Sequence, residues 1–207
     1  MSRTPETCLL ACGILRREMD ELARQGRLPG RPVYLSSRLH NDYGMLKRAL
    51  EGAIPKQKER FAGRVVVVYG DVCLGFQNEM PELVAAHGVV KVKALNCLDC
   101  QLGGGGRLLD LDPTHKILFL NQSFIDFFQR IELKYPAEEI QPMFSVLEGI
   151  ILLDPLGDLD DFDEEIARIS RLTGLPIRER LDLGLDGLEK VLREAVARVG
   201  APHNPTP

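Results

Sequence analysis

Short apolar runs alternate along this chain with longer segments in which apolar residues recur every three or four positions, and this alternation constrains the fold most. Residues 65–68 and 150–153 are continuously apolar, which is typical of strands covered on both faces. The runs predict seven strands, at residues 7–11, 32–35, 64–69, 89–95, 116–120, 149–153 and 176–181.

The segments between these runs have the spacing of amphipathic helices. Five such helices are expected, around residues 15–23, 43–54, 124–131, 162–172 and 185–199. Strands that alternate with helices of this length form βαβ units. The pattern predicts an α/β fold with one doubly wound, mostly parallel, Rossmann-like sheet of about six to seven strands and helices on both faces. At 207 residues we expect a single domain over 1–200 and a frayed tail at 201–207.

The composition narrows the classes of function. The net charge of −4 argues against nucleic acids and anionic membranes as partners, because both favour a basic face. No apolar run approaches the roughly 20 residues that span a bilayer. The short apolar stretch near the N-terminus is interpreted as a strand, so no signal peptide is expected. We therefore expect a cytoplasmic protein.

Four of the five cysteines fall where predicted strands end, namely Cys12, Cys73, Cys97 and Cys100. The carboxyl ends of parallel strands meet at one edge of a sheet, so these thiols are expected to converge. In a reducing compartment, clustered cysteines are more often metal ligands or redox groups than disulfides. The sequence predicts a metal site made by Cys12, Cys73 and Cys97, completed by Cys100 or His40. Zinc is the first choice of metal and an iron–sulfur cluster the second.

Polar and glycine residues accompany these thiols. Asp71, Asn96 and Asp99 are expected to orient the ligands, and Asp71, Asn96, Gly103 and Gly104 to contact a cofactor. The glycines at 103–106 could also suggest a phosphate-binding loop. However, the run follows Cys100 rather than a strand and no Gly-Lys-Ser/Thr follows it, so a turn beside the site is the preferred interpretation. Cys8, inside a strand, is expected to be an inert core residue.

Several of these motifs occur together over residues 7–125. They are Cys12-Gly13-Ile14-Leu15 with Glu18, Leu39-His40 with Leu46 and Leu50, Tyr69-Gly70-Asp71-Val72-Cys73-Leu74-Gly75, and Asn96-Cys97 with Gly103-Gly104. In this combination the chain resembles the domain of unknown function (DUF) family 1638, found mostly in anaerobic archaea and bacteria. It departs from the family pattern by one inserted residue before Cys73 and by Asn96 in place of an aspartate. The resemblance implies an accessory or methyl-transfer role near corrinoid-dependent systems.

Three functions stay open at this point. The first is a cytoplasmic metal-binding protein that serves corrinoid-linked methyl transfer, with a small molecule or cofactor as ligand and a corrinoid or methyltransferase protein as partner. The second is a non-catalytic module that binds or delivers a corrinoid, although the usual Asp-x-His-x-x-Gly signature is absent. The third is a thiol redox protein that uses Cys97 and Cys100. The sequence does not decide whether the protein is an enzyme.

Overall fold

The computed structural model describes residues 6–199, apart from the side chains of residues 40 and 41. Two predictions fall outside these described residues, namely the frayed tail at 201–207 and the side chain of His40 as a ligand. The chain forms two compact units. Unit 1 consists of Met1–Gly106 with Asp186–Pro207, and unit 2 of Arg107–Leu185. The expectation of a single domain stays a prediction.

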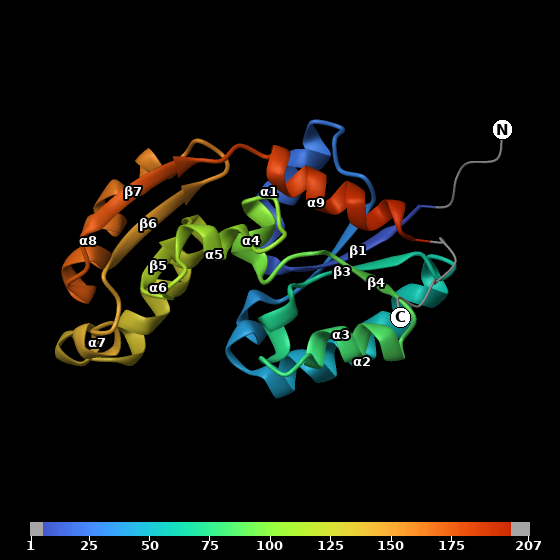
Figure 1. Cartoon of the computed structure of the whole chain (residues 1–207), viewed down its shortest axis with the longest axis horizontal. Coiled ribbons are helices and arrows are strands. Elements are labelled where there is room, and N and C mark those ends of the chain that lie inside the picture. Colours follow the sequence, from blue (N-terminus) through green and yellow to red (C-terminus); the bar gives the residue numbers. More distant parts are fainter. Residues whose placement is uncertain (1–5, 200–207) are drawn as a thin grey trace. The chain divides into compact units, whose positions relative to one another are not determined.

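Unit 1 has three layers built around four parallel strands in the order β2-β1-β3-β4. The strands are β1 (Cys8–Cys12), β2 (Arg31–Leu35), β3 (Val65–Val68) and β4 (Val90–Lys91). The longer helices are α1 (Arg16–Arg24), α2 (Tyr43–Arg60), α3 (Glu79–Ala86) and α9 (Asp186–Ala197). Figure 1 shows α1 and α9 on one face of this sheet and α2 and α3 on the other. Right-handed crossovers explain this, because the step from β1 to β2 runs opposite to the steps toward β3 and β4.

The strand β4 is much shorter than predicted. The Val92 N–H still donates to Val67 of β3, but the backbone groups beyond it leave the strand ladder and bond to a loop. The Ala94 carbonyl accepts the N–H of Asp71 at 2.9 Å, and the Leu95 carbonyl accepts the N–H of Val72 at 3.0 Å. The periodicity of the sequence cannot reveal these two hydrogen bonds, because each joins residues that are distant in sequence.

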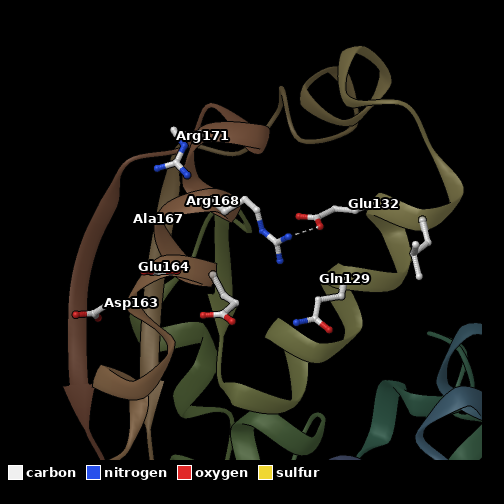
Figure 2. A pocket seen from close by; sticks show the side chains of 9 residues that line it. Gln129, Glu132, Asp163, Glu164, Ala167, Arg168 and Arg171 are labelled. Carbon is white, nitrogen blue, oxygen red and sulfur yellow. Dashed lines mark ion pairs between the residues drawn. The ribbon is translucent and has the colours of Figure 1, made fainter.

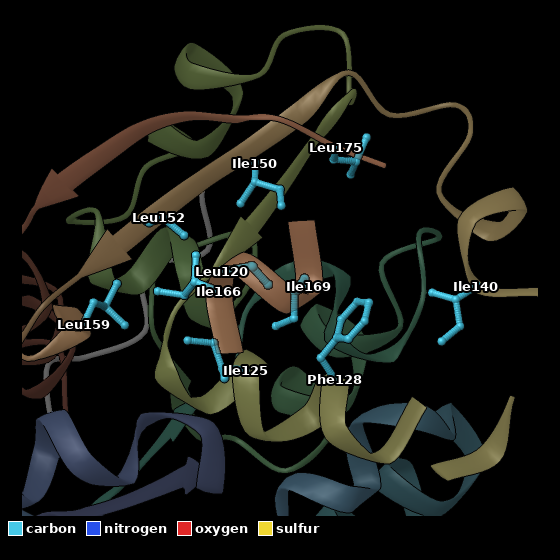
Figure 3. Close-up of a cluster of buried hydrophobic side chains, with 10 residues drawn as sticks. All are labelled: Leu120, Ile125, Phe128, Ile140, Ile150, Leu152, Leu159, Ile166, Ile169 and Leu175. Atoms are coloured by element: carbon cyan, nitrogen blue, oxygen red, sulfur yellow. The ribbon is translucent and has the colours of Figure 1, made fainter. Parts of the chain in front are cut away.

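Unit 2 has three parallel strands in the order β5-β6-β7. Its elements are α5 (Arg107–Leu111), β5 (Ile117–Leu120), α6 (Gln122–Lys134), α7 (Ala137–Met143), β6 (Gly149–Asp154), α8 (Asp163–Thr173) and β7 (Ile177–Asp182). Both crossovers run in the same direction, so handedness places α6, α7 and α8 on one face of the sheet. Apolar side chains from β5, β6 and these helices form the core shown in Figure 3, including Leu120, Phe128, Ile150 and Ile166.

The mixed α/β character and all seven predicted strands are confirmed, but the single sheet is wrong. The strands of the described residues divide into a four-stranded and a three-stranded parallel sheet. The connection between β4 and β5 explains the break, since it contains only two helices of five residues, α4 (Cys97–Gln101) and α5. A crossover within one parallel sheet normally needs a longer helix to cover the sheet face. No helix among the described residues combines the length and apolarity needed to cross a membrane.

Candidate functional site

The sheet of unit 1 has a topological switch point between β1 and β3. The chain leaves β1 toward β2 and leaves β3 toward β4, so these two neighbouring strands send their connections in opposite directions. Such a divergence opens a crevice at the carboxyl ends of the two strands, where ligands bind in open α/β sheets. Cys12 is the last residue of β1, and Cys73 lies in the short helix η3 (Asp71–Leu74) directly after β3. Both thiols therefore lie at the carboxyl ends of these two neighbouring strands.

A close backbone crossing brings Cys97 to the same place. A Cβ atom on Gly70 would lie 2.2 Å from the carbonyl carbon and oxygen of Leu95 and 2.3 Å from the nitrogen of Asn96. Only glycine allows the loop after β3 to pass so near the loop after β4. Cys97 follows this crossing in one of the two loops, as the first residue of α4. Cys73 follows it in the other loop, within η3. The glycine thus sets the approach of two cysteines that are distant in sequence.

The thiols of Cys12, Cys73 and Cys97 form a connected group, called here the thiol trio. All three residues are buried, with 2%, 4% and 2% of their surface exposed. Hydrogen bonds with the Cys12 and Cys73 thiols raise the pKa of Cys97 well above its usual value, and burial raises it further. The Cys97 thiol is therefore held in its protonated form, because both its partners and the loss of water disfavour a bare thiolate.

Cys100 lies near the trio without joining its hydrogen bonds. It is fully buried, and burial is the main cause of the raised pKa of its thiol. Charges on Cys73, Asp99 and Cys12 would raise this pKa further, whereas Lys91 lowers it. The two-residue spacing in the sequence suggested a pair of Cys97 with Cys100. The fold instead gives Cys97 its main thiol partners from two other strand ends.

Tyr69 is a site residue that the sequence reasoning did not single out. The register that pairs Ala11 with Val68 places Tyr69 beside Cys12 at the ends of neighbouring strands. Only 1% of Tyr69 is exposed, and its hydroxyl has no hydrogen-bond partner of good geometry among the described residues. Burial raises its pKa most, followed by the three thiols of the trio, with a hydrogen-bonding contribution from Cys12 as the smallest cause. A tyrosine directly after a buried strand was the available signal.

Asn96 and Asp99 hold the loop around Cys97. The Asn96 side chain caps α4 by accepting the N–H of Asp99 at 2.9 Å. One carboxylate oxygen of Asp99, which is fully buried, accepts the N–H groups of Leu95 at 2.9 Å and Gly106 at 3.0 Å. These bonds position the backbone on both sides of the cysteine pair.

The remaining predicted contact residues are also engaged within the protein. Asp71 forms an ion pair with Lys91 at 2.6 Å. Gly103 and Gly104 donate their N–H groups to the carbonyls of Cys100 and Asp99. The next two glycines of the run bond internally as well, and all four have positive φ angles. The run is therefore a turn whose amides already have acceptors, which favours the turn interpretation over a phosphate-binding loop.

The described residues do not form a ready-made coordination shell. Among them, no group of three or more His, Cys, Asp or Glu side chains is arranged to hold a metal ion. The trio is connected through thiol hydrogen bonds instead, and coordination would require its side chains to rotate and lose protons. None of the five cysteines, all of which lie in the described part of the chain, forms a disulfide, and burial raises the pKa of Cys8, at the opposite end of β1, to about 11.

Unit 2 contains a separate groove between α6 and α8, with a volume of about 860 Å³ (Figure 2). An ion pair of 3.1 Å between Arg168 and Glu132 joins its two walls. Glu164 lies at the start of α8, and Leu133 is 90% exposed on α6. No cysteine lines this groove, so it offers none of the chemistry of the trio.

The family comparison matches residues 34–192 with the family described as "Protein of unknown function (DUF1638)". The chain belongs to this family. The matched range contains Tyr69, Cys73, Cys97 and Cys100, whereas Cys12 lies before it. No curated protein and no solved structure matches the chain.

Proposed function

We propose that this protein binds a soft metal ion, zinc in the first instance, through the thiolates of Cys12, Cys73 and Cys97. The observation that carries the proposal is that the buried Cys97 thiol is hydrogen-bonded to the buried thiols of Cys12 and Cys73 at the switch point of the unit 1 sheet. The three buried thiols come from the ends of three strands, and one ligand that bonds to all three sulfur atoms would satisfy them together. A thiophilic cation does so, because sulfur ligands select zinc and related soft metals.

Hydrogen-bonded thiols in general lie close to the sulfur–sulfur separation that such an ion needs. Zinc binds thiolates at about 2.3 Å, and tetrahedral angles then separate the sulfur atoms by about 3.8 Å. Thiols that exchange hydrogen bonds are at a similar separation, so rotation about the Cα–Cβ bonds can convert one arrangement into the other. The raised pKa of Cys97 makes proton release the main cost of binding. Metal affinity should therefore increase with pH.

The trio supports metal binding better than thiol redox chemistry. A redox cysteine is usually an accessible thiolate with a lowered pKa. Here Cys97 and Cys100 are buried and both pKa values are raised. An iron–sulfur cluster is the second metal candidate, because the same thiolates would bind it. A zinc-bound thiolate would suit methyl transfer in a corrinoid-linked system, and this role stays part of the proposal. The free thiols suit a reducing cytoplasmic environment.

Elemental analysis of protein purified without oxygen tests the proposal. Cys12→Ser, Cys73→Ser and Cys97→Ser are compared with wild type and with Cys8→Ala, a buried cysteine of the same sheet outside the trio. We expect close to one equivalent of metal in wild type and Cys8→Ala, and at least tenfold weaker zinc binding in each trio variant. Circular dichroism verifies that the variants fold. A folded wild type that takes up neither zinc nor iron, or a Cys97→Ser variant of unchanged affinity, refutes the proposal.

A further inference from the structure

The hydroxyl of Tyr69 is a buried polar group of unit 1 that has no hydrogen-bond partner of good geometry among the described residues. The side chain lies at the carboxyl end of β3, beside Cys12, with 1% of its surface exposed. A buried hydroxyl normally has such a partner, because desolvation without one costs free energy. A donor without a partner of good geometry, close enough to three thiols to feel their charges, therefore indicates that an acceptor belongs in the same space.

We propose, on the basis of the metal site proposed above, that Tyr69 donates a hydrogen bond to a small exchangeable ligand from outside the protein. This ligand occupies the fourth position on the metal, beside the three thiolates. Three protein ligands with one open position is the arrangement of catalytic zinc sites, whereas structural sites are closed by four. The ligand class is a small molecule or anion with a lone pair toward the hydroxyl, with water as the resting occupant.

Cys100 is the protein group that competes for this fourth position. Its thiol is fully buried and feels Cys73 and Cys12 electrostatically, without the hydrogen bonds that link the trio. The groups that act most strongly on Tyr69 are the three thiols of the trio, and Cys100 is not among them. Cys12 and Cys73 thus act on both the hydroxyl and Cys100, whereas Cys97 is among the main causes for the hydroxyl only. The Cys100→Ser variant below distinguishes an external ligand from closure of the site by Cys100.

The charge of the site also favours a small ligand. Three thiolates with one divalent cation leave a net charge of −1 in a buried site, and Lys91, which acts on Cys100 and pairs with Asp71, is a nearby cation. A fourth thiolate would add another negative charge that burial disfavours. Water adds no charge, and the charge of a bound anion would be partly offset by the hydrogen bond from the tyrosine. The hydroxyl then selects for ligands that accept a hydrogen bond.

Cobalt(II) substitution combined with azide titration tests this assignment on the full-length protein. Cobalt reports thiolate ligands through charge-transfer absorption and reports geometry through its visible bands, and azide is the probe for an exchangeable position. In wild type we expect cobalt to bind and azide to shift the visible bands. In Tyr69→Phe we expect azide to bind at least tenfold more weakly while cobalt affinity changes less than threefold. Cys100→Ser should keep the charge-transfer intensity of wild type.

Thermal unfolding of the metal-free variants separates this role from a structural one. Because the hydroxyl is unpaired without ligand, Tyr69→Phe should leave the Tm of the metal-free protein unchanged or raise it. Tyr34→Phe is the matched control, since its hydroxyl donates to Asp20 at 2.6 Å. That variant should lower Tm and leave azide binding as in wild type.

The outcomes distinguish the two proposals. Wild type that binds no cobalt overturns the metal site, and the assignment of Tyr69 with it. Cobalt binding with equal azide affinity in wild type and Tyr69→Phe overturns the assignment alone. Loss of about a quarter of the charge-transfer intensity in Cys100→Ser identifies that cysteine as the fourth ligand and also overturns it. A lower Tm in metal-free Tyr69→Phe assigns the hydroxyl a structural bond within the protein instead.

Discussion

Each of the two units of this protein is a parallel sheet covered by helices, but the residues at the carboxyl ends of the buried strands differ between the units. In unit 1 the strand order reverses between β1 and β3, and the strand ends hold three linked thiols and an unpaired tyrosine hydroxyl. In unit 2 the order is sequential. The buried carboxylate of Asp154 ends β6 and accepts N–H groups from Gly157, Asp158 and Leu159 and a hydrogen bond from Arg180.

This comparison shows why a polar residue at a strand end does not by itself identify a ligand site. Asp154 is as buried as the thiols, with 1% of its surface exposed, but its oxygens are occupied by the loop that follows. The strand ends of unit 1 lie at a switch point, where the following loops separate and leave space. The order of strands decides which kind of strand end is available to a ligand.

The largest expected effect comes from Gly70→Ala in unit 1. The new methyl group would overlap the backbone of Leu95 and Asn96 at 2.2 to 2.3 Å, and backbone atoms cannot move aside independently. We expect a loss of about 3 kcal/mol or more in the free energy of unfolding, together with loss of metal binding. Urea unfolding and zinc titration measure both. A Gly70→Ala protein with wild-type stability would show that the crossing of the two loops is not needed to form the site.

Asp154→Ala should destabilise the protein without affecting the metal site. The change leaves three backbone N–H groups and the guanidinium of Arg180 without their acceptor, which should cost about 2 to 4 kcal/mol. Asp182→Ala is the control, because that carboxylate is 87% exposed and lies 3.8 Å from the same arginine. It should change stability by less than about 0.5 kcal/mol. Reduced zinc affinity in folded Asp154→Ala would contradict the separation of roles between the units.

The two units should respond to opposite extremes of pH. Burial raises the pKa of Cys8 from 9.0 to about 11 in the folded protein. A raised pKa stabilises the fold below pH 9, and this stabilisation is lost as the pH increases to about 11. For this one thiol the loss is about 2 to 3 kcal/mol, and Cys97 contributes in the same direction. Urea unfolding of metal-free wild type and Cys8→Ala between pH 8 and 11 measures the difference. Equal slopes in the two proteins would contradict this assignment.

The acid response should come from Asp154. Burial acts to raise its pKa, but the hydrogen bonds from Arg180 and from the backbone outweigh burial, so the pKa lies below its usual value of 3.8. A lowered pKa stabilises the fold above pH 4, and the stabilisation is lost as the pH falls below that value. Asp154→Asn should therefore flatten the acid side of the stability curve, as measured by urea unfolding between pH 3 and 6. An unchanged acid slope would contradict it.

The smallest expected effect is that of Gly52→Ala in α2. This variant is the control for Gly70→Ala, because it adds the same methyl group at a position without overlap. Apart from the adjacent residues and the nearby backbone of its own helix, no described residue has an atom within 4 Å of the position of a Cβ at Gly52. Alanine should stabilise the helix by about 0.5 to 1 kcal/mol, because glycine is the poorer helix former. Thermal unfolding measures this gain. A loss of stability here would show that added methyl groups in unit 1 are harmful for reasons other than overlap.

Much of the fold was accessible from local patterns. The runs at 65–68 and 149–153 predicted β3 and β6 within one residue at each end, because a buried strand needs continuous apolar side chains. The length of β4 was not accessible, since its ladder is interrupted by bonds from Asp71 and Val72 to carbonyls beyond Lys91. Those partners are about twenty residues away, and no periodicity records them.

For the candidate site, the sequence by itself determined that thiols follow several strands and that Gly70 and Asn96 stand beside them. It predicted that Cys12, Cys73 and Cys97 would converge, but it left open whether Cys100 would join them and did not reveal that Tyr69 would lie beside Cys12 with an unsatisfied hydroxyl. The tertiary structure decided both, through the strand order 2-1-3-4 and the crossing at Gly70. Helix and strand periods follow from contacts a few residues apart, whereas the neighbours of a strand depend on which distant surfaces pack together.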